Sequence, residues 1–178
     1  MQLVTIDQPN HQVLREKARS ISFPLEDEIQ DFIKEFKEFF ITLNGSGLAA
    51  PQVGVSLRIA VIQVTEKAFK VRKNVTHTVP LTTIINPSYT PVIESGKNQD
   101  WEKCYSVPNR VGQVNRYNAV YYRWKNERGE EETGLAEGFF ARVLQHEIDH
   151  LNGILYFDLI KSSERYGSLE EMMPYLTA

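Results

Sequence analysis

The sequence predicts an α+β fold in which antiparallel or mixed β-sheets share one domain with a few helices. Two segments, 25–43 and 139–151, have apolar residues at helical spacing. The runs rich in β-branched and aromatic residues lie between them and do not alternate with helices, which disfavours a parallel sheet. A chain of 178 residues, of which 42% are hydrophobic, can bury one core. We therefore expect a single domain over residues 1–178.

The first helix is expected directly after Pro24, over LEDEIQDFIKEFKEFFITL at 25–43. Its apolar stripe consists of Ile29, Phe32, Ile33, Phe36, Phe39 and Phe40. NGSG at 44–47 ends the helix, because Asn and Gly accept left-handed backbone angles. The following GLAAPQVGV, at 47–55, is rich in small residues and proline, so we expect a loop there.

Strands are expected where β-branched and aromatic residues gather, at 58–64, 81–87, 90–94 and 119–124. We interpret the intervening segment 65–80 as a surface excursion with some strand character. NERGEE at 126–131 has the turn chemistry of a hairpin. Asn152 and Gly153 end the second helix, and a short terminal helix is expected around 168–176.

The composition argues against several classes of function. A net charge of -3 gives no general attraction to nucleic acid. The densest basic stretch, 67–73, alternates with apolar residues. No apolar run approaches the roughly 20 residues that span a bilayer, and the N-terminus lacks the apolar stretch of a signal peptide. Cys104 is the single cysteine, so no internal disulfide forms. We expect a monomeric cytoplasmic protein with no specific nucleic-acid or membrane binding.

The second helix, FFARVLQHEIDHL at 139–151, contains an HExxH motif. Each helical residue advances by about 100°, so His146 and His150 lie on one side, where both rings can reach one cation. Glu147 flanks that position, where a general base could take a proton from water. Burying two imidazoles and a carboxylate without partners would be unfavourable. A metal site is therefore favoured over two ordinary core histidines.

The third metal ligand is open at this point. Catalytic zinc-type sites take three protein ligands. Cys104 is a strong candidate, because a thiolate suits zinc or ferrous iron beside two imidazoles, although a lone cysteine is more often a small buried hydrophobe. Glu164 or Glu170 could serve instead, as in a zinc endopeptidase. We interpret His11 and His77, in polar surroundings, as surface residues.

Three segments together resemble, in order and spacing, the signature segments of the peptide deformylases. They are GSGLAAPQ at 45–52, EKCYS at 102–106 and QHEIDH at 145–150. Four further stretches are similar to family sequence: PNHQVLREKA near the start, IINP at 84–87, VNRYNAV at 114–120 and GFFARVLQHE. The resemblance covers most of the chain.

The resemblance implies an α+β domain in which antiparallel strands surround a central metal-binding helix. It also implies hydrolysis of the formyl group from the initiator methionine of nascent polypeptides near the ribosome, releasing formate. The implied cofactor is one divalent metal ion, Fe(II) in the cell, with zinc, nickel or cobalt in preparations.

The resemblance also assigns roles to individual positions. The implied metal ligands are Cys104, His146 and His150, and the implied acid/base is Glu147. The implied oxyanion donors are Gln52 and the backbone N–H of Tyr105. Substrate contacts are implied for the backbone of Gly47 and for Phe139 and Val143, which line the methionine pocket.

The central segment departs from the family pattern, which usually reads Glu-Gly-Cys-Leu-Ser. Tyr105 should leave the oxyanion N–H intact, because that donor belongs to the backbone. Lys103 replaces a glycine and adds an ammonium group near the substrate entrance, so we include it among the substrate-binding residues. The chain between Gln52 and Glu102 is longer than in compact bacterial members, which leaves the subtype open. The alternatives are a deformylase-like protein in which the change at Lys103 alters substrate preference or efficiency, and one that only binds peptide N-termini.

Overall fold

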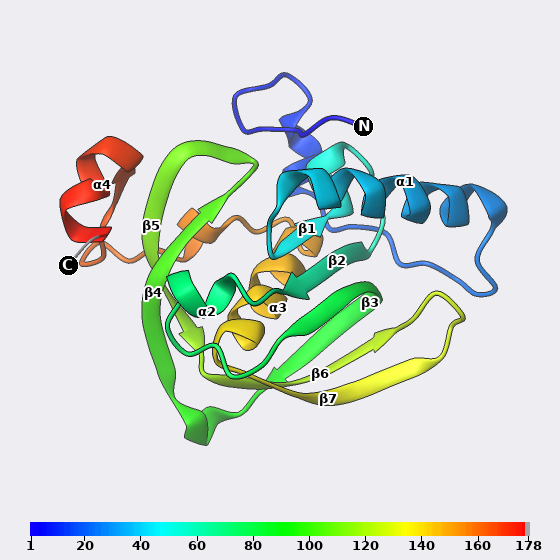
Figure 1. Ribbon diagram of the computed structural model, residues 1–178. Helices are drawn as coiled ribbons and strands as arrows, with labels where there is room; N and C mark the ends of the chain where they lie inside the picture. The colour runs from blue at the N-terminus through cyan, green and yellow to red at the C-terminus, as the bar shows by residue number, and fades with distance from the viewer. Residues whose placement is uncertain (177–178) are drawn as a thin grey trace.

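The computed structural model describes residues 1–176 and has an α+β fold built from two antiparallel sheets (Figure 1). The first sheet has five strands in the order β1-β2-β3-β6-β7. Its strands are β1 (Gly47–Ala49), β2 (Ile59–Val64), β3 (Val79–Pro91), β6 (Ala119–Lys125) and β7 (Glu131–Glu137). The second sheet has the order β4-β5-β8 and consists of β4 (Lys97–Cys104), β5 (Val107–Tyr117) and β8 (Tyr166–Ser168).

The helices confirm the expected periodic segments. The α-helices in the described part of the chain are α1 (Asp27–Leu43), α2 (Ala68–Val71), α3 (Gly138–Leu151) and α4 (Leu169–Leu176). The 3₁₀ helices are η1 (His11–Arg15), η2 (Ala50–Val53), η3 (Ile93–Ser95) and η4 (Tyr156–Leu159). α3 contacts strands of both sheets and runs through the middle of the molecule in Figure 1. No helix within residues 1–176 has the length and apolar character needed to cross a membrane.

The core occupies both faces of the five-stranded sheet. Along β2, Ile59 and Val61 pack in a cluster with the apolar face of α1, whereas Ala60 and Ile62 pack in a cluster with α3. A strand covered on both faces is apolar almost without interruption. This explains the sequence IAVIQV and fixes α3 against the inner face of the sheet.

The segment expected to be a loop at 47–55 is more regular than predicted. β1 pairs antiparallel with β2, with Leu48 opposite Val61, and η2 follows directly. Small residues fit here because β1 packs closely on α3, which the composition of the segment alone could not indicate.

The two strands expected at 81–87 and 90–94 form one strand, β3, followed by η3. Asn86 has a φ of 51°, and the pairing register shifts between Ile85 and Ser88. The Asn86 side chain accepts from the N–H of Ile21 at 3.0 Å and donates to its carbonyl at 2.8 Å. The predicted break was wrong because a contact with a distant segment holds the strand together at this bulge.

β4 and β5 were not predicted, because their sequences are polar and alternate only partly. They pair from Lys97 opposite Tyr117 to Cys104 opposite Val107. The turn at Tyr105 and Ser106 brings the end of β4 toward α3. The expected hairpin turn between β6 and β7 is confirmed, with Gly129 at a φ of 82°.

Candidate metal centre

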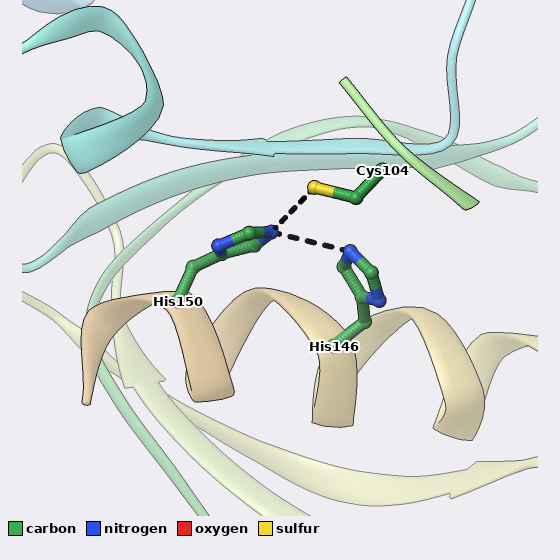
Figure 2. Close-up of side chains that lie close together, drawn as sticks. All are labelled: Cys104, His146 and His150. Atoms are coloured by element: carbon green, nitrogen blue, oxygen red, sulfur yellow. Dashed lines mark hydrogen bonds between the residues drawn. The ribbon is translucent and has the colours of Figure 1, made fainter. Parts of the chain in front are cut away.

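Cys104, His146 and His150 bring their ligand atoms together where the end of β4 faces α3 (Figure 2). His146 and His150 come from successive turns of α3, and Cys104 comes from the end of β4. The two Nε2 atoms are 3.2 Å apart, and Cys104 Sγ is 3.2 Å from His150 Nε2. All three ligand atoms lie within 4.8 Å of one another. Bonds of roughly 2.0–2.3 Å to one tetrahedral ion place ligand atoms about 3–4 Å apart, so the set fits a bound cation.

The orientation of His146 also fits metal binding. Its Nδ1 lies 2.9 Å from Glu102 Oε2, a contact that places the proton on Nδ1 and leaves Nε2 as a donor to the ion. Burial opposes protonation of His146, but bonding to Cys104 and Glu102 raises its pKa well above the usual value, so metal binding competes with a proton. Burial and the neighbouring His146 lower the pKa of His150 well below the usual value.

Glu102 is the hub of a buried polar network that supports this histidine. Its Oε1 accepts from Arg116 Nε at 2.9 Å and from Arg142 Nη1 at 2.6 Å. Its Oε2 accepts from Arg116 Nη2 at 2.9 Å, in addition to His146. Burial alone would raise the pKa of Glu102, but Arg116 and His146 outweigh it and hold the pKa well below its usual range. Arg116 also binds Asp149 of α3.

The sequence did not identify the residues of this polar network, which are Glu102, Arg116, Arg142 and Asp149. A partial signal was present, because Glu102 precedes Cys104 by two positions and therefore points to the same side of a strand. The arginines gave none, since they are separated from Glu102 by 14 and 40 residues.

Glu147 lies beside the cluster and is almost completely buried. Its Oε2 has no hydrogen-bond partner among residues 1–176. Burial raises the pKa of Glu147 to about 7. A Cβ built on Gly47 would lie only 2.2 Å from Glu147 Oε1, so a larger residue at this position would push the carboxylate out of its place.

Gln52 reaches the cluster from η2. Its Oε1 accepts from the N–H of Ala49 at 2.9 Å, which fixes the amide orientation. Its Nε2 donates to Cys104 Sγ at 3.4 Å and to Ser106 Oγ at 3.3 Å. The amide nitrogen of Gln52 therefore faces the sulfur of Cys104 and the hydroxyl of Ser106.

Tyr105 and Lys103 flank the cysteine on β4 and its turn. The Tyr105 hydroxyl donates to the carbonyl of Leu43 at 2.9 Å, and its ring covers Gly45. The backbone N–H of Tyr105 has no acceptor within the described residues. Lys103 is exposed, whereas its neighbours Glu102 and Cys104 are buried.

A cavity of about 750 Å³ leads from the surface to the cluster. Apart from His150, which lies deeper, the predicted site residues line it: Gly47, Gln52, Lys103, Cys104, Tyr105, Phe139, Val143, His146 and Glu147. Phe139 and Val143 stand one turn apart at the start of α3 and give part of the cavity an apolar wall.

The alternative ligands lie elsewhere. Glu164 accepts from Asn115 Nδ2 at 2.6 Å and from the N–H of Lys161 at 2.7 Å, and Glu170 is exposed on α4. Neither belongs to the cluster of possible metal ligands found in residues 1–176, nor do His11 and His77.

Comparisons with known proteins agree with one another. Residues 2–166 match the family model described as polypeptide deformylase. Peptide deformylase 2 of Rickettsia conorii is 39% identical over 163 residues, which cover 90% of this chain and 80% of that protein.

Solved structures give the same result. The peptide deformylase from Synechococcus elongatus in complex with actinonin has a TM-score of 0.76 at 30% identity, covering 92% of this chain and 80% of that one. The Met-Ala-Ser-bound class I type b peptide deformylase from Acinetobacter baumannii has a TM-score of 0.77 at 26% identity, covering 90% of this chain and 98% of that one.

The family model and the relatives each span most of the sequence, and the fold agrees over the same extent. The expected resemblance is thereby confirmed: the chain belongs to the peptide deformylases, a family of enzymes with a catalytic metal.

Proposed function

We propose that this protein hydrolyses the N-formyl group from the initiator methionine of nascent polypeptides and releases formate. The observation that carries the proposal is the Cys104, His146 and His150 cluster at the inner end of an open cavity, with Glu147 beside it, in a member of this family.

One divalent ion would be held by Cys104 of β4 together with His146 and His150 of α3. In this proposal α3 is the central, metal-binding helix of the fold. One thiolate and two imidazoles suit Fe(II), which we propose as the metal in the cell, and also zinc, nickel or cobalt in preparations. When bound, such an ion supplies Lewis acidity, which lowers the pKa of water and polarises a carbonyl group.

Glu147 would move the proton. Its Oε2 has no partner in the described part of the chain, so it is available to accept a proton from the attacking water. As the carbon–nitrogen bond of the formamide breaks, the same proton passes to the departing amine. The products are formate and a free methionyl N-terminus.

Gln52 and Tyr105 would stabilise the charge that develops on the formyl oxygen. Gln52 Nε2 already lies 3.4 Å from Cys104 Sγ, and the N–H of Tyr105 follows the same cysteine. A preorganised donor of this kind typically contributes on the order of 10²–10³ in rate.

Gly47, Phe139 and Val143 would bind the substrate. β1 is an edge strand of its sheet, so its backbone at Gly47 could pair with an extended peptide in the manner of an added strand. Phe139 and Val143 give the methionine side chain an apolar wall. A nascent-chain substrate also implies a cytoplasmic location near ribosomes. We propose that residues 1–178 act there as one catalytic domain and as a monomer.

The test is anaerobic purification with metal analysis, followed by formate release from formyl-Met-Ala-Ser. Iron-loaded wild-type protein should release formate. Glu147→Ala should keep the metal and lose turnover, because Glu147 lies outside the ligand set, whereas Cys104→Ala should lose both.

If fully loaded wild-type protein releases no formate from several formyl-peptides, the deformylase proposal is refuted in favour of a peptide-binding role. If Cys104→Ala keeps its metal while a Glu164 or Glu170 variant loses it, the zinc endopeptidase arrangement is favoured instead.

A further inference from the structure

The mouth of the cavity carries three cationic side chains, although the chain as a whole is acidic. Lys67, Arg72 and Lys103 all line the cavity. The net charge of the full chain is -3. A local positive surface on an acidic protein indicates a selective role for charge at this entrance.

Two separate elements supply these cations. Lys67 and Arg72 flank α2 at its start and end. Arg72 is held in place, since its Nη1 donates to the carbonyl of Trp101 at 2.9 Å and its guanidinium carbon lies 5.3 Å from the centre of the Phe139 ring. Lys103 projects from β4 to the outside, one residue before Cys104. The cations therefore come from α2 and from β4, two elements that the Arg72–Trp101 hydrogen bond joins at the cavity mouth.

The carboxylates of the cavity do not pair with Lys67, Arg72 or Lys103. The carboxylates that line the cavity, within the described residues, are Glu102 and Glu147. Glu102 is buried and fully engaged with Arg116, Arg142 and His146. Glu147 is also buried, deep in the site.

No carboxylate oxygen in residues 1–176 lies within 4.0 Å of a charged nitrogen of Lys67, Arg72 or Lys103. The three charges are therefore free to attract an acidic group on a ligand.

We propose that Lys67, Arg72 and Lys103 select formyl-methionyl substrates with an acidic side chain at one of the two residues that follow methionine. This inference rests on the deformylase function proposed above. With methionine against Phe139 and Val143, an extended chain advances roughly 3.3 Å per residue. The next two residues consequently pass the mouth, within reach of flexible lysine side chains.

The test compares peptides that differ only in charge. The kcat/KM for formyl-Met-Glu-Ser-amide is measured against formyl-Met-Gln-Ser-amide, and that for formyl-Met-Ala-Glu-amide against formyl-Met-Ala-Gln-amide. The C-terminal amide removes the other carboxylate that could bind. Partly exposed ion pairs of this kind predict a preference for Glu of about two- to fivefold in at least one pair at low salt. The preference should fall toward unity at about 0.5 M salt.

Variants that remove the cationic side chains test whether these residues cause the preference for Glu. Lys67→Gln combined with Lys103→Gln should lower the Glu/Gln ratio by at least half, and Lys103→Arg should retain it. Lys34→Gln is the matched control, because it removes an exposed lysine of α1 that does not line the cavity. Thermal melting of each variant separates loss of folding from loss of preference.

The outcomes distinguish the two proposals. Turnover of the Gln peptides with no preference for Glu in either pair overturns this inference and leaves the deformylase function intact. A preference that survives unchanged in the double variant also overturns it. No formate from any peptide refutes the deformylase function, and the substrate preference with it.

Discussion

The close approach of β1 to Glu147 makes Gly47→Ala a sensitive test of the site geometry. An added Cβ would lie 2.2 Å from Glu147 Oε1, 2.5 Å from Cδ and 2.7 Å from Cγ, whereas ordinary contact begins at 3.4 Å. The carboxylate must therefore move by about 1 Å to restore normal contact distances. Gly47 has no left-handed backbone angle, so the clash comes from the side chain alone.

A displacement of this size should reduce turnover strongly. Misplacing a reacting group by about 1 Å can lower the rate on the order of 10²-fold. We expect kcat for formyl-Met-Ala-Ser to fall by roughly that factor, while the metal content stays at the wild-type level. A rise in KM alone would instead indicate that the methyl group obstructs the peptide.

A double-mutant cycle isolates the contact between Gly47 and Glu147. Glu147→Asp withdraws the carboxylate by one methylene, so Gly47→Ala should have a much smaller effect in that background. Gly134→Ala is the matched control on β7, where the added Cβ would meet Tyr122 at 2.5 Å, away from the cluster. Equal effects of Gly47→Ala in both backgrounds, or wild-type kcat in the single variant, would refute the reasoning.

Three further predictions follow from the buried groups around the cluster. Glu102→Ala leaves Arg142 without its buried carboxylate and Arg116 with Asp149 alone, so the free energy of unfolding should fall by about 3–5 kcal/mol in denaturant titrations; wild-type stability would contradict the hub role of Glu102. Tyr156→Phe removes a buried hydroxyl that has no partner in the described residues, so stability should be unchanged or rise by up to about 1 kcal/mol; a clear loss would reveal a partner for the hydroxyl. Chelation should lower the melting temperature, because an ion bound only to the folded state at about 100 times its Kd stabilises it by about 2.7 kcal/mol; Cys104→Ser should abolish this difference, and an equal shift in that variant would exclude sulfur as a ligand.

The sequence predicted α1 and α3 well because their apolar residues repeat at helical spacing and depend little on distant segments. The HExxH motif likewise brought His146 and His150 together by local geometry. The juxtaposition of Cys104 with both histidines depended instead on the resemblance, since spacing alone left Glu164 and Glu170 open as third ligands.

What the sequence could not predict depends on long-range contacts. β4 and β5 carry polar side chains such as Asn98 and Asn115, whose strand conformation is set by pairing with each other. The continuity of β3 depends on Asn86 bonding to Ile21, 65 residues away. No local pattern contains either piece of information.

X-ray absorption spectroscopy at the edge of the bound metal tests the joint ligation by Cys104, His146 and His150 most directly. The site predicts one sulfur at about 2.3 Å and two imidazole nitrogens at about 2.0–2.1 Å for zinc-loaded protein, with the sulfur signal lost in Cys104→Ser. A spectrum with no sulfur in the wild-type protein, or one unchanged by that substitution, would contradict the metal centre proposed here.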